Sequence, residues 1–255
     1  MAWLVDLDGV VWRGEQPIAG AADAVGQLRA QGERLLFLTN NSSATLEDYQ
    51  AKLGGFGIDV AAHELVTSAQ AAATLVDAGA RVLVCAGSGV DEALHARGAQ
   101  PVRDGTSVDA VVVGWHRDFD FSGLTAAFRA VVAGARLIGT NDDPTYPTPD
   151  GLLPGGGAIL AAVATASGVA PTVAGKPHEP MAALVRERLG EELGGSVLVG
   201  DRPSTDGLMA RRLGVRFALV LSGVTLRDDL PVVPAPEVVA ADFAAVVAEL
   251  DQRGV

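Results

Sequence analysis

Reactive side chains follow four apolar runs of this 255-residue chain, each at the point where the run ends. They are Asp6 and Asp8 after the run 3–5, Thr39, Asn40 and Asn41 after 35–38, Lys176 after 172–174, and Asp201 and Asp206 after 197–199. In open parallel sheets, ligands bind beyond the carboxyl ends of the strands. If the four runs are such strands, these carboxylates, amides, hydroxyl and ammonium meet in one crevice.

These residue types favour phosphoryl transfer assisted by a divalent cation. Hard oxygen ligands without histidine or cysteine partners indicate Mg²⁺ rather than Zn²⁺. Asp6 can attack phosphorus and form an aspartyl-phosphate, which divides one difficult displacement into two easier ones. Asp8, two residues further on, can protonate the leaving alkoxide and then activate water. Asp201 is expected to bind the metal together with Asp6.

The remaining polar residues are expected to bind the phosphate. The Thr39 hydroxyl and the backbone N–H groups of Asn40 and Asn41 can donate to phosphate oxygens. Lys176 can offset the charge of the phosphate and of the nucleophile. Only two of the 19 basic residues are lysines, Lys52 and Lys176. A lysine at 176 therefore favours a compact ammonium over a guanidinium fork at that position.

Alternating strands and helices must position these residues, because short apolar runs alternate with longer helical patterns along the chain. Strands are expected at 3–5, 35–38, 82–85, 110–113, 136–139, 172–174, 197–199 and 217–221. Helices are expected at 21–31, 45–56, 69–78, 89–97, 122–133, 158–167, 180–189 and 205–213. This repetition predicts an α/β fold with parallel sheets and right-handed crossovers.

Composition limits the partners and the compartment. The net charge of −12 argues against nucleic acid and anionic membranes, since both require basic patches. No signal peptide is visible, and no apolar stretch reaches the length of a membrane span. Cys85 is the only cysteine, which fits a reducing, cytoplasmic location. It stands in the apolar run 82–86 and is expected to be a buried, unreactive thiol.

Taken together, the motifs resemble those of the haloacid dehalogenase superfamily, and most closely its NagD-like or 4-nitrophenylphosphatase branch. The matching segments are Asp6-Leu7-Asp8-Gly9-Val10, Thr39-Asn40-Asn41, Gly175-Lys176-Pro177 and Gly200-Asp201-Arg202-Pro203-Ser204-Thr205-Asp206. This branch includes glycerol-3-phosphate, phosphoglycolate and pyridoxal-phosphate phosphatases. Ala44, His116 and Gly207 depart from its usual pattern, and none of the three stands at a catalytic position.

The resemblance implies two domains. A doubly wound, Rossmann-like catalytic core would comprise 1–68 and 174–255, and a large α/β cap at 69–173 would be inserted into it. The interval between Thr39 and Lys176 is long enough for such a domain. Dimers are common among similar proteins, so the resemblance also allows a homodimer.

The resemblance further implies a metal site and an activity. Mg²⁺ would be bound by the carboxylates of Asp6 and Asp201 and by the backbone carbonyl of Asp8, with Asp206 hydrogen-bonding behind them. The implied activity is hydrolysis of small phosphomonoesters, such as sugar or polyol phosphates, through an aspartyl-phosphate. The partner would be a small phosphorylated metabolite.

Other functions stay open at this point. A receiver-like signalling module also combines acidic residues, a hydroxyl and a lysine, but it accepts a phosphoryl group without turnover and has no inserted domain. Dehalogenation or phosphomutation are other reactions of the same scaffold, although dehalogenases lack the second aspartate that Asp8 provides. Among phosphatases, a nucleotide or pyridoxal-phosphate substrate is an alternative.

Substrate selection is expected in the cap, in the segment Asp142–Gly156. Its prolines stiffen it, and Tyr146 offers a ring and a hydroxyl to the substrate, whereas a solvated loop is the alternative. Asp142 and Asp143 are expected to disfavour a second anionic group. This favours sugar and polyol monophosphates over bisphosphates.

Three further side chains near the motifs are assigned structural roles. Trp12 and Trp115 are expected to be packing residues. His178 follows Lys176 closely and could reach the site, but a solvated position at the start of a helix is favoured for it.

Overall fold

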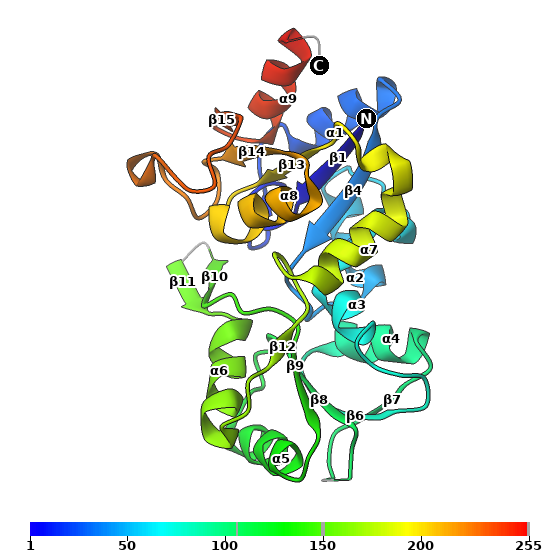
Figure 1. The fold of residues 1–255 in the computed structure, drawn as a ribbon. Coiled ribbons are helices and arrows are strands. Elements are labelled where there is room, and N and C mark those ends of the chain that lie inside the picture. The colour runs from blue at the N-terminus through cyan, green and yellow to red at the C-terminus, as the bar shows by residue number, and fades with distance from the viewer. Residues whose placement is uncertain (106, 149–150, 254–255) are drawn as a thin grey trace.

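The computed structural model describes residues 1–105, 107–148 and 151–253, and two parallel sheets dominate it (Figure 1). The larger sheet has the strand order β15-β14-β13-β1-β4-β5. Its strands are β1 (Ala2–Asp6), β4 (Arg34–Thr39), β5 (Leu65–Thr67), β13 (Val197–Gly200), β14 (Arg216–Val220) and β15 (Val238–Ala240). The smaller sheet has the order β12-β9-β8-β6-β7. Its strands are β6 (Arg81–Cys85), β7 (Gln100–Val102), β8 (Ala110–Val113), β9 (Arg136–Gly139) and β12 (Thr172–Val173).

Helices and two hairpins complete the architecture. The helices are α1 (Ala21–Ala30), α2 (Leu46–Gly55), α3 (Ser68–Ala73), α4 (Ser88–Ala96), α5 (Phe121–Val132), α6 (Gly156–Ser167), α7 (Glu179–Leu189), α8 (Leu208–Leu213) and α9 (Phe243–Gln252). The antiparallel hairpins are β2 (Trp12–Arg13) with β3 (Gln16–Pro17), and β10 (Thr145–Thr148) with β11 (Gly151–Pro154). Figure 1 shows the β10–β11 hairpin between the two sheets. Within the described ranges, no helix is long and apolar enough to cross a bilayer.

β1 lies in the middle of the larger sheet, between β13 and β4, and all five of its residues are buried. Successive side chains of a strand point to opposite faces. Leu4 accordingly packs into the apolar cluster on one face. Trp3 and Val5 pack into the cluster on the other face. A strand buried on both faces is held firmly, so its last residue, Asp6, has a defined position at the carboxyl edge of the sheet.

α2 begins directly after the loop that carries the Thr39 motif. Thr45 Oγ1 accepts a hydrogen bond from Asp48 N at 3.2 Å, and Asp48 Oδ2 accepts one from Thr45 N at 3.0 Å. This reciprocal capping box satisfies two N–H groups of the first turn and sets where the helix starts. Lys52 follows in the last turn of the helix.

The α/β class with parallel sheets is confirmed, and a strand forms at each of the eight predicted places. The helix predicted at 69–78 is wrong in its second half, since α3 ends at Ala73. There the Thr74 hydroxyl donates to the Ala71 carbonyl at 2.7 Å and competes with the helical hydrogen bonds. The prediction at 205–213 is also inexact, because a π-helical turn precedes α8.

The two hairpins, three short strands of the parallel sheets and the last helix are absent from the sequence prediction. β5, β7 and β15 have three residues each, too few for a period of two to be recognised. α9, in contrast, carries a clear signal, because its buried residues Phe243, Val246, Val247 and Leu250 follow helical spacing. This pattern could have identified the helix.

Candidate active site

β1 and the turn after it present two carboxylates at the edge of the larger sheet. Asp6 is the last residue of β1, and Asp8 lies two residues into the turn. The turn passes through Gly9, which has a φ of +85°. A side chain at this position would be strained at that φ and would collide with the Asp201 carboxylate, so the turn requires glycine.

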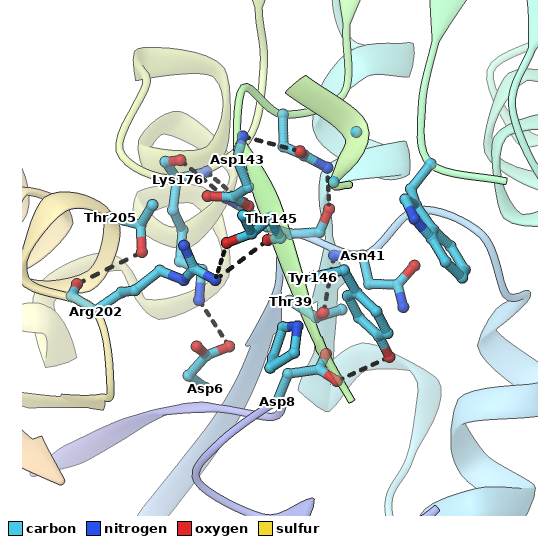
Figure 2. Close-up of a pocket in the computed structure, with 16 residues that line it drawn as sticks. Asp6, Asp8, Thr39, Asn41, Asp143, Thr145, Tyr146, Lys176, Arg202 and Thr205 are labelled. Atoms are coloured by element: carbon cyan, nitrogen blue, oxygen red, sulfur yellow. Dashed lines mark hydrogen bonds and ion pairs between the residues drawn. The ribbon is translucent and has the colours of Figure 1, made fainter. Parts of the chain in front are cut away.

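Lys176 lies between the carboxylates of Asp6 and Asp206, and Figure 2 shows its contact with Asp6. Its Nζ is 2.7 Å from Asp6 Oδ1 and 2.7 Å from Asp206 Oδ1, and its side chain is 2% exposed. Asn40 holds the main chain of this lysine: its Oδ1 accepts from Lys176 N at 2.7 Å, and its Nδ2 donates to Lys176 O at 3.0 Å. Burial alone would lower the pKa of Lys176, but Asp206 and Asp6 outweigh it and raise the pKa. The side chain is therefore an ammonium.

Three buried carboxylates face one another beside this ammonium. Asp6, Asp201 and Asp206 each offer an oxygen, and these oxygens lie within 4.8 Å of one another. Burial raises the pKa of Asp6 and that of Asp201, the latter to about 7, and repulsion from Asp206 adds to both shifts. Glycines make room for the group, since a side chain at Gly200 would collide with Asp206 and one at Gly223 with Asp201.

The charge and the donor atoms of this group fit a divalent cation. Three carboxylates beside one ammonium leave a buried net negative charge, which is unfavourable unless a further cation balances it. All the donors are hard oxygens, the ligands that Mg²⁺ prefers. Of the side chains predicted to bind metal, the structure thus brings Asp6 and Asp201 together. The predicted contribution of Asp8 is its backbone carbonyl, and its carboxylate lies outside the group.

The Asp8 carboxylate instead faces the hairpins on either side of it. Its Oδ1 accepts hydrogen bonds from Trp12 Nε1 at 2.9 Å and from the Tyr146 hydroxyl at 3.2 Å. Burial raises the pKa of Asp8, although the Trp12 bond and the charge of Lys52 partly oppose the shift. A carboxyl group with a raised pKa retains its proton at higher pH, as a general acid requires.

The loop after β4 lines the site with the three predicted phosphate-binding residues. The Thr39 hydroxyl accepts a hydrogen bond from Asn41 N at 3.0 Å. Asn41 Oδ1 accepts from Ser43 N at 3.0 Å and from Ser43 Oγ at 2.7 Å, so the side chain is anchored within the loop. The Asn40 side chain has a role that the sequence did not predict, since it binds the Lys176 main chain and Asp143 Oδ2, and phosphate binding by the Asn40 backbone N–H stays a prediction.

The segment 142–156 forms the β10–β11 hairpin rather than a loop, and positions 149–150 of the predicted stretch lie outside the described residues. The residues just before β10, and β10 itself, contact loops of the larger sheet at successive points. Asp143 accepts from Asn40 Nδ2 at 2.9 Å, Thr145 O accepts from Arg202 Nη2 at 3.2 Å, and Tyr146 donates to Asp8. The hairpin is thereby tied to three of the loops that carry the motifs.

The expectation that Asp142 and Asp143 disfavour a second anionic group stays a prediction, and the structure places the two carboxylates in different surroundings. The Asp142 carboxylate lies 3.1 Å from His178 Nε2, and this bond to the imidazole lowers the pKa of Asp142. His178 occupies the position before α7, at the helix start expected for it. Asp143 lines the site but is bonded to Asn40. The two acids therefore do not act as a pair.

Sequence reasoning missed several side chains that line the site, among them Trp115 and Arg202. Trp115, expected to be a packing residue, stacks on Tyr146 with ring centres 4.8 Å apart, and its Nε1 donates to Pro154 O at 3.1 Å. It follows β8 closely, so the rule that ligands bind beyond strand ends could have identified it. Arg202, next to Asp201, reaches across the site to the hairpin (Figure 2).

Two cavities meet at the aromatic pair of Trp115 and Tyr146. The inner cavity has a volume of about 60 Å³, and its lining includes Asp6, Thr39, Lys176 and Arg202. The outer cavity has a volume of about 590 Å³, and its lining includes Trp12, Lys52, Arg117 and Leu152. Asp8, Asn41, Trp115 and Tyr146 line both cavities. The proposed general acid therefore lies at the junction.

Comparison with known proteins places this geometry in a family context. A family model described as haloacid dehalogenase-like hydrolase matches residues 3–100, and a related HAD-hydrolase-like model matches residues 173–246. The D-glycerol 3-phosphate phosphatase of Mycobacterium tuberculosis is 40% identical over 227 residues, which are 87% of this chain. The chain spans 63% of the length of that relative.

Two further proteins resemble the chain over nearly its whole length. The acid sugar phosphatase of Staphylococcus saprophyticus is 34% identical over 98% of both chains. The crystal structure of a glycerol phosphate phosphatase from Mycobacterium tuberculosis in complex with magnesium matches with a TM-score of 0.87 and 37% identity, over 96% of this chain and 75% of the other. This chain belongs to the haloacid dehalogenase-like hydrolases, in the NagD-like branch of that family.

Proposed function

We propose that this protein is a Mg²⁺-dependent phosphatase that hydrolyses small phosphomonoesters through an aspartyl-phosphate on Asp6. The observation that carries the proposal is the buried contact of Lys176 with Asp6 and Asp206, beside Asp201, at the carboxyl ends of parallel strands. The named phosphatases among the relatives, and the magnesium in one similar structure, support the reaction and the cofactor.

The residues divide the reaction into two displacements. Asp6 attacks phosphorus while Asp8 protonates the leaving oxygen, and Asp8 then removes a proton from the water that hydrolyses the aspartyl-phosphate. Lys176 offsets the negative charge that Asp6 and the phosphate bring together, and the Thr39 hydroxyl donates to a phosphate oxygen. Asp6, Asp201 and the Asp8 carbonyl would hold Mg²⁺, whose positive charge would reduce repulsion between substrate and carboxylates.

Asp206 serves this site by holding other residues. Its Oδ1 binds Lys176 Nζ at 2.7 Å, and its Oδ2 accepts from Arg202 N at 3.1 Å. The carboxylate thus ties the lysine to the loop that carries Asp201. We assign Asp206 to this supporting role behind the metal ligands.

The domain division proposed for this function is a core of 1–68 and 174–255 with a cap of 69–173. The strand order supports it, because the larger sheet combines β1, β4 and β5 with β13, β14 and β15, whereas the smaller sheet uses only strands between residues 81 and 173. The site lies where the β10–β11 hairpin of the proposed cap contacts the proposed core. Closure of such a cap would exclude water from the chemistry.

The substrates proposed are sugar, polyol and related monophosphates. The activities after which two relatives are named, on glycerol 3-phosphate and on sugar phosphates, support this class. A homodimer and a cytoplasmic location stay predictions from the sequence.

Phosphate release from a panel of small phosphometabolites tests the proposal. We expect continuous release in the presence of Mg²⁺, none in EDTA, and recovery when Mg²⁺ is restored. Release of a single equivalent per protein would indicate a receiver-like module instead. Full activity in EDTA after exhaustive dialysis would overturn the metal assignment.

A further inference from the structure

Lys52 is a cation of the outer cavity that the proposed mechanism does not use. Its Nζ donates to Gly14 O at 2.7 Å and lies 3.2 Å from Glu15 Oε1. The same Nζ lies 4.7 Å from the centre of the Trp12 ring, and Trp12 Nε1 donates to Asp8 Oδ1. The ammonium is therefore held one side chain away from the proposed general acid, on the wall that faces the β10–β11 hairpin.

The sizes of the two cavities indicate where the leaving group of a substrate goes. The inner cavity, at about 60 Å³, is much smaller than the outer one at about 590 Å³, and its lining includes Thr39 and Lys176, which are proposed to bind the phosphoryl group. Asp8 lines both cavities, so the oxygen that it protonates lies at their junction. The rest of the leaving group must then extend into the outer cavity, where Lys52 lies.

The charges that line the outer cavity leave Lys52 accessible to an anion. Of the three acids that line this cavity within the described residues, Asp8 is bonded to Trp12 and Tyr146. Asp48 is engaged by the capping box with Thr45. Glu15, the partner of Lys52, has a side chain that is 90% exposed, and such an exposed ion pair contributes little stability. A carboxylate of the substrate can replace Glu15 at the Lys52 ammonium with little loss of stability. Arg117, 5.8 Å from the Trp115 ring on the opposite wall, adds a second positive charge.

We propose that Lys52 is a specificity-determining residue that binds a carboxylate on the leaving group of the substrate. The inference rests on the phosphatase function proposed above and adds phosphomonoesters with an acidic leaving group to the substrates proposed there. It also assigns part of substrate selection to α2 and the β2–β3 hairpin, in addition to the Tyr146 segment.

Two aryl phosphates of matched shape separate charge from size: 4-carboxyphenyl phosphate and its neutral analogue 4-carbamoylphenyl phosphate. The measurement is the ratio of their kcat/KM values. Lys52→Met retains an apolar stem over Trp12 but removes the charge, and we expect it to lower the ratio about tenfold, mainly through KM. Lys52→Arg should retain most of the ratio. Arg129→Met, on the exposed face of α5, is the control and should leave it unchanged.

The outcomes distinguish this inference from the proposed function. An unchanged ratio in Lys52→Met overturns the inference, and so does an equal loss on both substrates, because Lys52 would then only support Trp12 and Asp8. A wild-type protein that hydrolyses both esters without preference for the carboxylate also contradicts it, while leaving the phosphatase function intact. A wild-type protein that releases no phosphate from any monoester contradicts the proposed function itself.

Discussion

At the scale of single residues, very few cations balance the excess of buried negative charge in this site. The Lys176 ammonium is shared between Asp6 and Asp206 at 2.7 Å each, and almost no solvent reaches it. Removing one charged partner from such a buried group leaves the charge of the others uncompensated, which lowers the stability of the fold. The length and the shape of this side chain therefore matter as much as its charge.

Replacing Lys176 with arginine tests the requirement for that shape. The planar guanidinium cannot place one nitrogen between Asp6 and Asp206 in a space that is already filled. We expect Lys176→Arg to lose more than tenfold in kcat/KM, which corresponds to about 1.4 kcal/mol of transition-state stabilisation. A rate close to that of the wild type, measured by steady-state kinetics, would show that a compact ammonium is not needed there.

The sequence predicted which residues meet in the site where a local rule applied, namely that ligands bind beyond the carboxyl ends of strands. Asp6 ends β1 and Asp201 follows β13, and these neighbouring parallel strands bring their carboxyl ends to one edge of the larger sheet. Lys176 follows β12 of the smaller sheet, so the rule found this residue although its strand belongs to the other sheet. Trp115 was assigned to packing, because its stacking on Tyr146 depends on a hairpin that lies far away in the sequence. No local pattern encodes such a contact.

At the scale of elements, the turns after β1, β13 and β14 are packed around one carboxylate. Asp201 Oδ2 accepts a hydrogen bond from Val224 N at 2.6 Å. The carboxylate occupies the space that side chains at Gly9 and Gly223 would fill. Close backbone approach of this kind is available only to glycine. The turns therefore position the proposed metal ligand Asp201.

A methyl group at Gly223 should displace that ligand. The added Cβ would collide with the Asp201 carboxylate, so Gly223→Ala should raise the Mg²⁺ concentration that supports half-maximal activity by more than about tenfold, the loss of a charge-assisted contact. Gly26→Ala is the matched control, because it lies within α1 with no atom near its added Cβ. It should stabilise the fold by about 0.5–1 kcal/mol in denaturant unfolding. A folded Gly223→Ala protein with an unaltered Mg²⁺ requirement would argue against the role of Asp201.

A substitution in the β10–β11 hairpin should change kcat/KM by different amounts for different substrates. Tyr146 stacks on Trp115 and binds Asp8 at the junction of the cavities, so it is placed to touch the leaving group. We expect Tyr146→Ala to change kcat/KM unequally across substrates, by roughly 1–3 kcal/mol for the preferred one. Tyr146→Phe, which keeps the ring, should retain most of the selectivity. Equal losses on all substrates would place the selectivity determinant elsewhere.

The alternation of elements was predictable because each long strand carries an uninterrupted apolar run. The runs at β8 and β13 are fully buried, as strands covered by helices on both faces require. The hairpin was not predictable as such, since Tyr146 and its neighbours are only half-buried and alternate with prolines and polar residues. Its conformation depends on its contacts with Arg202 and Asp8.

At the scale of the whole molecule, the net charge of −12 opposes the binding of an anionic substrate. Charges more than about 10 Å away are largely screened at physiological ionic strength, so the local groups determine the potential in the site. Lys176 and Arg202 line the inner cavity, and Lys52 and Arg117 line the outer one. The few cations that this acidic chain has near the cavities, with Mg²⁺, would make the crevice receptive to phosphate.

Direct detection of the covalent intermediate tests the central claim most sharply. Wild-type protein quenched in acid during turnover, and digested for mass spectrometry, should carry one phosphoryl group on Asp6. Asp6→Asn should remain folded and release no phosphate, because an amide does not attack phosphorus. A phosphoryl group on another residue, or turnover retained by Asp6→Asn, would contradict the account.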